Sequence, residues 1–211
     1  MKWHLEVLPA VQRALWDSRI HEGFPGWVLY GGTALALRFG HRESVDFDFF
    51  SRQPLEPLTF KEANALDGEV LQAGRNTLTL LHKGVKLSFF GGLTLNVVSP
   101  PDLMGNCRVA SVDDLAACKL AALVNRVELK DYLDIAALLQ SGISLSHMLG
   151  CANAVYREEF PVTACLKSLV WFDTPELNDL PESHRQLLDK AAIAVDGIPK
   201  ITPQQSLIGL P

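Results

Sequence analysis

The first part of the chain alternates between two spacings of its apolar residues. Leucine, valine and isoleucine recur at helical intervals over residues 4–22, and a glycine and a proline then end the pattern. A short apolar run at 26–32 leads through glycines into the helix-forming residues 33–40. Residues 44–50 alternate polar and apolar with a period of two, which is typical of a half-buried strand. The pattern therefore predicts helix, strand, helix and strand in that order.

The middle of the chain continues this mixture before the pattern becomes helical. Residues 58–68 have helical composition, and β-rich, glycine-punctuated segments then predict further strands over 69–74, 76–84, 85–92 and 93–100. From Ser111, which with Asp114 forms an acidic variant of a capping box, the apolar spacing is helical. Later helices are predicted over 144–159, 161–170 and 182–195, and no structure is predicted beyond residue 197.

These elements predict an α+β fold with a mixed β-sheet flanked by helices and a mainly helical C-terminal region. We expect an α/β core over residues 1–110 and a helical region over residues 111–211 that packs on it. A chain of 211 residues, 48% hydrophobic and 20% charged, is long enough for one good core with a helical appendage.

Composition narrows the setting in which the protein works. Every apolar run is broken by charge well before the roughly 18 residues of a membrane span, and the charged N-terminus does not resemble a secretory signal. We therefore expect a cytoplasmic protein that makes no membrane contact. The four cysteines match neither a zinc pattern nor a disulfide framework, so we expect reduced thiols. The net charge of -5 argues against broad nucleic-acid binding but leaves a local basic site open.

The strand over residues 44–50 carries two carboxylates, a residue type that strands disfavour. Asp46 and Asp48 are two residues apart, so their side chains project from one face about 6.5–7 Å apart, while Phe47 and Phe49 point the other way. Two such carboxylates are able to share a hard divalent cation. A solvated edge face is the alternative interpretation, and the pair alone leaves both open.

A glycine pair precedes this strand, with hydroxyl and basic side chains between. Gly31 and Gly32 lie where a strand meets a helix, a place at which backbone N–H groups and the helix dipole favour a phosphate, although a tight turn explains them equally well. The hydroxyl and basic side chains between the glycines and the aspartates are those of Thr33, Arg38, His41, Arg42 and Ser44. Helix capping by the threonine and a solvated surface for the others are the alternatives.

Together, residues 31–50 resemble the first motif of polymerase-β-type nucleotidyltransferases and, more narrowly, that of the AbiEii/AbiGii toxin group. The stretch matches neither the P-loop nor the dinucleotide-binding glycine motif. A second block, "CKLAALVNRVELKDYLDIAALL", is similar to a later motif of the same group, with a lysine, an arginine and KDxxD on helices. In this chain these residues are Lys119, Arg126, Lys130, Asp131 and Asp134. The resemblance covers residues 28–50 and 111–140 well.

The resemblance implies a nucleotidyltransferase-like sheet and a Mg2+-dependent transfer of a nucleoside monophosphate from a triphosphate such as ATP or GTP. The acceptor would be a hydroxyl of a tRNA, a protein or a small molecule, in a toxin-antitoxin or phage-defence system with a cognate antitoxin. The implied catalytic residues are Asp46, Asp48, Lys119 and Asp131, of which Asp46 and Asp48 hold the metal. The implied nucleotide-binding residues are Gly31, Gly32, Thr33, Arg38, Arg42, Ser44, Lys86, Arg126 and Lys130. The helical region would complete the site.

The chain departs from the wider pattern at one position. Polymerase-β-type enzymes usually carry a third carboxylate on a later strand, and here Ser88 occupies the expected place, where it is a weaker Mg2+ ligand. A catalytically degenerate nucleotide-binding or protein-interaction module is therefore the alternative. A metal-dependent phosphohydrolase is a third interpretation, which would require more histidine and carboxylate ligands.

Two further expectations concern the basic residues. Without the resemblance, Arg126, Lys130 and Asp134 would form a surface charge ladder along one helix, unless a break falls near Glu128. Lys86 would place a cation beside the triphosphate or be a solvated edge lysine. A local basic patch for a nucleic-acid acceptor would consist of Arg38, Arg42, Lys83, Lys86 and Lys119.

Overall fold

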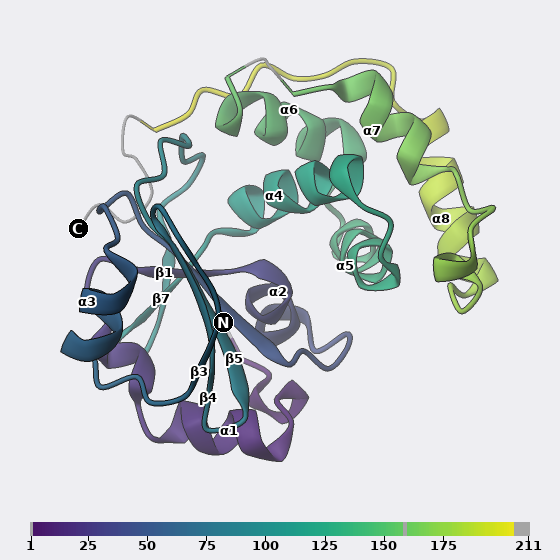
Figure 1. Ribbon diagram of the computed structural model, residues 1–211. Helices are drawn as coiled ribbons and strands as arrows, with labels where there is room; N and C mark the ends of the chain where they lie inside the picture. Colours follow the sequence, from purple (N-terminus) through teal and green to yellow (C-terminus); the bar gives the residue numbers. More distant parts are fainter. Residues whose placement is uncertain (1, 158–159, 205–211) are drawn as a thin grey trace. The chain divides into compact units, whose positions relative to one another are not determined.

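The computed structural model describes residues 2–157 and 160–204, which form two compact units (Figure 1). The described residues of the first unit are 2–95 and 100–111, and those of the second are 96–99 and 112–204. The first unit contains the β-sheet and the second is helical. The α+β class predicted from the sequence is confirmed.

A seven-stranded mixed sheet forms the centre of the first unit, with its strands in the order β3-β4-β5-β2-β1-β7-β6. The strands are β1 (Val28–Tyr30), β2 (Asp46–Phe50), β3 (Glu69–Gly74), β4 (Thr77–His82), β5 (Val85–Phe90), β6 (Asp102–Met104) and β7 (Cys107–Val109). Strand β2 lies antiparallel to β1 and parallel to β5. The strand with the two aspartates is therefore central and has a neighbour on each side.

Alternation along β2 places an aromatic core on one face of the sheet. Phe47 and Phe49 are 1% and 2% exposed, whereas Asp46 and Asp48 remain partly exposed. Phe49 stacks on Phe89 of β5 with 5.4 Å between ring centroids. Burying each ring stabilises the fold by about 1.5–3 kcal/mol, and a one-residue slip would turn the carboxylates into the core. The core therefore fixes which face carries the carboxylates.

Helix α2 (Gly31–Phe39) follows β1 without a linker and packs against β1 and β2. It ends at Gly40, which adopts the left-handed conformation (φ 64°) and donates its N–H to the carbonyl of Ala36. This is a favoured helix ending, because glycine has no Cβ to oppose positive φ. The predicted order of strand, glycine turn, helix and strand is confirmed.

The single helix predicted over residues 4–22 is wrong. The segment forms a 3₁₀ turn at Leu5–Val7, helix α1 at Ala10–Asp17 and a second 3₁₀ turn at Ile20–Gly23. Pro9, which precedes α1, has no N–H to donate, and Arg19 interrupts the helix in the left-handed conformation (φ 62°). Apolar spacing alone does not reveal such breaks.

The predicted strands at 69–74, 76–84 and 85–92 are confirmed as β3, β4 and β5. The helix predicted over 58–68 is shorter, since α3 spans Pro57–Ala63 and Ala65 has a φ of 48°. The hairpin of β6 and β7 was not predicted from the pattern, because each strand has three residues. Its turn carries Gly105 (φ 60°) followed by asparagine, a hairpin dipeptide that offered the signal.

The strand predicted over residues 93–100 is wrong. Within the described residues this segment makes one isolated bridge, between Val97 and Gln204. The N–H of Asn96 donates to the carbonyl of Val155, and the N–H of Val98 donates to the carboxylate of Asp114 at 2.7 Å. Its backbone thus finds partners in the second unit, whose described part offers no strand with which to form a ladder.

Five α-helices form most of the described part of the second unit. They are α4 (Val112–Asn125), α5 (Leu129–Gln140), α6 (Leu145–Val155), α7 (Val162–Leu169) and α8 (Glu182–Ile193), with a 3₁₀ turn at Pro175–Leu177. Helix α4 packs against α5, α6 and α7, and α8 packs against α5 and α7. The three later helices are confirmed, although residues 158 and 159 of the predicted 144–159 helix lie outside the described residues. Residues 198–203 carry neither helix nor strand, as predicted, and α8 ends two residues earlier than the predicted 182–195 helix.

Among the helices described, none has by itself the length and hydropathy needed to cross a bilayer. Helices α5 and α6 are long and apolar enough only when they are taken together, and a bend of 116° separates them.

Candidate functional site

The turn between β1 and α2 lies directly against Asp48. Gly31 has a φ of 73°, and a Cβ built on it would lie 3.2 Å from Cγ and 3.3 Å from Cβ of Asp48, and closer still to a carboxylate oxygen. A side chain at Gly31 would therefore collide with Asp48 and strain the backbone. The glycine turn that opens α2 and the aspartate of β2 meet at one place in the first unit.

The sheet register surrounds the two aspartates with residues of β5 and β1. Asp46 lies opposite Lys86, and its carboxylate is 2.9 Å from Lys86 Nζ. Asp48 lies opposite Ser88 on one side and Tyr30 on the other. The Asp46 and Lys86 side chains are 24% and 41% exposed, so water screens this ion pair and its contribution to stability is small. Lys86 is therefore able to leave Asp46 for another anion at little cost.

Ser88 occupies the position at which a third carboxylate was expected. It pairs with Asp48 across the sheet and is 3% exposed. On its other side, β4 contributes Thr79, which also has a hydroxyl rather than a carboxylate. At this level of the three strands β2, β5 and β4, Asp48 is thus the one carboxylate.

Three of the side chains predicted to bind the nucleotide have partners inside the protein. The buried hydroxyl of Thr33 lies 2.7 Å from Ser44 Oγ and donates to the carbonyl of Asp46. The Arg38 side chain is 1% exposed, pairs with Asp102 at 2.8 Å and donates to the carbonyls of Val109 and Ala110. Burial lowers the pKa of Arg38, and Asp102 opposes that shift. We interpret Thr33, Ser44 and Arg38 as residues that shape the site rather than line it.

The predicted basic patch of five residues is wrong, because two members are buried in ion pairs. Arg38 pairs with Asp102, and Lys119 belongs to the second unit, where it is 5% exposed. Arg42 is partly exposed and donates to the carbonyl of Glu43. Lys83 is exposed in the turn between β4 and β5.

A buried ion-pair cluster joins α4 to α5 in the second unit. Lys119 Nζ lies 2.8 Å from Asp131 Oδ1 and 2.5 Å from Asp134 Oδ2, and both aspartates are fully buried. Arg126 Nε donates to Asp131 at 2.9 Å. Burial by itself would raise the pKa of Asp131, but Lys119 and Arg126 outweigh it and the pKa lies below its usual value. The cluster thus keeps the Asp131 carboxylate ionised.

The surface charge ladder predicted for Arg126, Lys130 and Asp134 is wrong. The helix breaks between Asn125 and Leu129, as the alternative placed near Glu128 anticipated, so the three residues do not share one helix. Asp134 turns into the cluster with Lys119, and Lys130 pairs with Glu128 at 2.9 Å. The Arg126 and Lys130 side chains are each 45% exposed.

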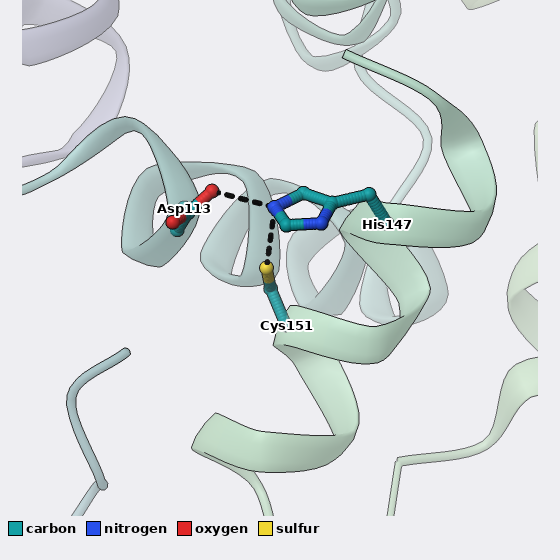
Figure 2. A group of neighbouring side chains, drawn as sticks. All are labelled: Asp113, His147 and Cys151. Atoms are coloured by element: carbon teal, nitrogen blue, oxygen red, sulfur yellow. Dashed lines mark hydrogen bonds and ion pairs between the residues drawn. The ribbon is translucent and has the colours of Figure 1, made fainter. Parts of the chain in front are cut away.

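A third group, Asp113, His147 and Cys151, lies between α4 and α6 (Figure 2). All four cysteines are free, as predicted. Burial, together with the charges of Asp113 and Asp114, raises the pKa of Cys151 to about 12. This group was not predicted from the sequence, although the spacing of His147 and Cys151 by four residues on a helix was a signal that they share a face.

We expect Gly31→Ala to lower nucleotide transfer by about a hundredfold, because displacing Asp48 by even about 1 Å would misplace the carboxylate to which the family resemblance assigns catalysis. Gly105→Ala is the matched control, since Gly105 also has positive φ (60°) but a Cβ added to it would have no neighbouring atom within 4 Å. Both variants should lose about 1–2 kcal/mol of stability from backbone strain. Steady-state transfer rates and urea unfolding measure the two effects. Equal activity of both variants would show that the contact between Gly31 and Asp48 is unimportant.

Comparisons with known proteins cover both units. A family model described as "Nucleotidyl transferase AbiEii toxin, Type IV TA system" matches residues 13–74 and 65–196. An uncharacterized protein of Aquifex aeolicus (strain VF5) is 34% identical over an alignment of 154 residues, which covers 69% of this chain and 73% of that protein. A crystal structure from H. pylori, of a protein provisionally assigned as a nucleotidyltransferase, has a TM-score of 0.53 at 18% identity. That match covers 85% of this chain and 91% of the H. pylori chain.

Proposed function

Because the chain belongs to the AbiEii family of nucleotidyl transferase toxins, we propose that it transfers a nucleoside monophosphate from a nucleoside triphosphate to an acceptor hydroxyl. The chain is a nucleotidyltransferase by family, and the proposal concerns its donor, metal and acceptor. One observation carries it: the carboxylate of Asp48 lies against the Gly31 turn that opens α2. A ligand for a cation and the N-terminus of a helix, which favours an anion, therefore share one place.

The residues on β2 fit Mg2+. This cation prefers oxygen ligands, keeps several waters, and is usually held by one or two carboxylates together with substrate phosphates. Asp46 and Asp48 supply two partly exposed carboxylates on one face of the strand. Ser88 adds a neutral hydroxyl beside Asp48 in place of a third carboxylate. Asp46 and Asp48 would hold the Mg2+, which when bound would supply positive charge to neutralise the charge that develops at the α-phosphate.

The other residues of the first unit would orient the triphosphate. The backbone N–H groups at Gly31 and Gly32 would face its phosphates, because the first turn of a helix leaves its N–H groups without partners in the helix. Lys86 would exchange its screened contact with Asp46 for a phosphate oxygen. Positioning and charge neutralisation supply most of the rate in transfers of this kind, so these contacts would account for catalysis.

For the second unit we propose two roles. Lys119, Asp131 and Asp134 would hold α4 and α5 together, since all three side chains are buried and the lysine pairs with both aspartates. Arg126 and Lys130 remain exposed enough to contact a nucleotide, as the resemblance implies.

The family description supports a toxin of a toxin-antitoxin pair, and we extend the proposal to a cognate antitoxin. The acceptor hydroxyl would belong to a tRNA, a protein or a small molecule. We also propose that the protein works in the cytoplasm, which the toxin-antitoxin setting of the family supports.

Binding of nucleoside triphosphates to the protein tests the identity of the donor. Transfer of a label to separated fractions of a cell extract tests the class of the acceptor. Isothermal titration calorimetry with each of the four Mg2+-nucleoside triphosphates should detect at least one that binds, and EDTA should weaken that binding. The labelled nucleotide is then incubated with tRNA, protein and small-molecule fractions of a cell extract. Label in one fraction identifies the acceptor class. No binding by any triphosphate would contradict the proposed donor.

A further inference from the structure

Three potential metal ligands of different chemistry converge between α4 and α6. Asp113 Oδ1 lies 2.8 Å from His147 Nε2, and Cys151 Sγ lies 3.4 Å from the same nitrogen. The carboxylate, imidazole and thiol atoms all lie within 4.8 Å of one another. In Figure 2 the three side chains point toward a common centre, with His147 and Cys151 on one helix and Asp113 on its neighbour. This group belongs to the second unit, whereas the carboxylates of β2 belong to the first.

We propose that Asp113, His147 and Cys151 form a site for a zinc-class divalent cation that fastens α6 to the start of α4. The proposal goes beyond nucleotide transfer and does not depend on it. The residues all lie in the second unit, as does Ser99, which contacts the group.

One of the ligand separations already matches tetrahedral coordination, and a second is about half an ångström short of it. Zinc bonds of about 2.3 Å to sulfur and about 2.0–2.2 Å to nitrogen and oxygen place neighbouring ligands roughly 3.3–3.6 Å apart. The separation of 3.4 Å between Cys151 Sγ and His147 Nε2 falls in that range. The separation of 2.8 Å between Asp113 and His147 needs to open by about half an ångström, which a rotation of the partly exposed His147 ring provides.

The protons held by this group and a bound cation are alternatives. Nε2 of His147 carries at most one proton, and when it donates that proton to Asp113 it has no lone pair for the Cys151 thiol. The thiol then has the Asp113 carboxylate as its acceptor, an interaction that also raises the pKa of Cys151. A cation between the three atoms would take the place of these two protons and bind all three ligands directly.

The surroundings supply the support and access that a metal site needs. Ser99 Oγ donates to Asp113 Oδ2 at 3.2 Å and so fixes the carboxylate from its outer side, as the hydrogen-bond partners of metal ligands do. Cys151 is fully buried, whereas 40% of the His147 side chain is exposed. The ion would therefore enter from the His147 side. The neighbouring carboxylate of Asp114 is held by the backbone N–H of Val98 and adds negative charge nearby.

The ligand set selects the ion. Imidazole and thiolate favour Zn2+, Co2+ and related ions, whereas Mg2+ prefers oxygen alone. With three protein ligands, the fourth position is left for water or another group. The proposed ion is thus chemically distinct from the Mg2+ proposed at Asp46 and Asp48.

Metal binding to the full chain tests the site. After treatment with EDTA and dialysis, the protein should bind about one equivalent of Zn2+ with sub-micromolar affinity in competition with a chelating dye. Co2+ should give the charge-transfer absorption of a thiolate ligand. Cys151→Ser and His147→Ala should each weaken Zn2+ binding by at least about a hundredfold, and Ser99→Ala by about tenfold. Bound Zn2+ should raise the melting temperature of the wild type but not of Cys151→Ser.

Cys118→Ser is the matched control, because it removes a thiol from α4 of the same unit but not from the group. It should bind Zn2+ as the wild type does. Circular dichroism checks that each variant is folded, and His147→Ala, which removes a partly exposed side chain, keeps the test valid if Cys151→Ser unfolds. Failure of the wild type to bind Zn2+, or equal binding by the wild type and His147→Ala, would overturn the proposal. Neither result would bear on nucleotide transfer.

Discussion

Asp48→Asn should lower the rate of nucleotide transfer by about a hundred- to a thousandfold while leaving the protein folded. The amide has nearly the shape of the carboxylate but carries no charge, so it would hold the proposed Mg2+ and its triphosphate much less well. Because Asp48 is partly exposed, its replacement should not disturb the aromatic core on the other face of β2. Transfer rates at saturating Mg2+-nucleotide, together with melting temperatures, measure the two effects.

Asp67→Asn is the control for this variant, since Asp67 is an exposed aspartate of the same unit that lies outside β2. It should transfer at the wild-type rate. Wild-type turnover by Asp48→Asn would remove Asp48 from the catalytic machinery. If Asp48→Asn also melted much earlier than the wild type, its loss of activity would instead reflect damage to the fold.

Lys119→Met should destabilise the protein by about 3–5 kcal/mol, because it leaves two fully buried carboxylates without their shared cation. Arg126 still contacts Asp131, so most of the loss should come from Asp134. Urea unfolding followed by far-ultraviolet circular dichroism measures the change, since the affected unit is helical. Adding Asp134→Leu to Lys119→Met should recover part of the lost stability, because it removes a buried carboxylate that has lost this cation.

Lys130→Met provides the comparison for Lys119→Met. Lys130 forms its ion pair with Glu128 at 45% exposure, so its loss should cost about 0–1 kcal/mol. Equal effects of the two substitutions would show that burial of Lys119 contributes nothing. If Lys119→Met kept its stability but lost transfer, the result would favour the phosphate contact implied by the family resemblance.

Much of the site in the first unit could be predicted from the sequence, because it follows from strand alternation. Asp46 and Asp48 are two residues apart on β2, and Lys86 and Ser88 are two apart on β5. Once the two strands pair, one register sets Asp46 beside Lys86 and Asp48 beside Ser88. The glycine turn was also visible, because few other sequences let a helix begin directly after a strand.

The burial of charged residues could not be predicted in the same way. An arginine such as Arg38 is usually exposed, and here Asp102 and two backbone carbonyls, all far along the chain, allow it to be buried. Lys119 and its aspartates lie on helices whose separation depends on the break after Asn125, which the apolar pattern did not fix. The same holds for Asp113, whose approach to His147 is a result of helix packing.

Tracing labelled phosphate from the triphosphate tests most directly the claim that this protein transfers a nucleoside monophosphate. The protein is incubated with Mg2+ and the binding triphosphate labelled either at the α-phosphate or at the γ-phosphate, together with the acceptor fraction. We predict that the α-label moves to the acceptor, that the γ-label leaves as pyrophosphate, and that Asp48→Asn slows both by about a hundred- to a thousandfold. Transfer of the γ-label to the acceptor, or release of both labels without any labelled acceptor, would contradict nucleotide transfer by this site.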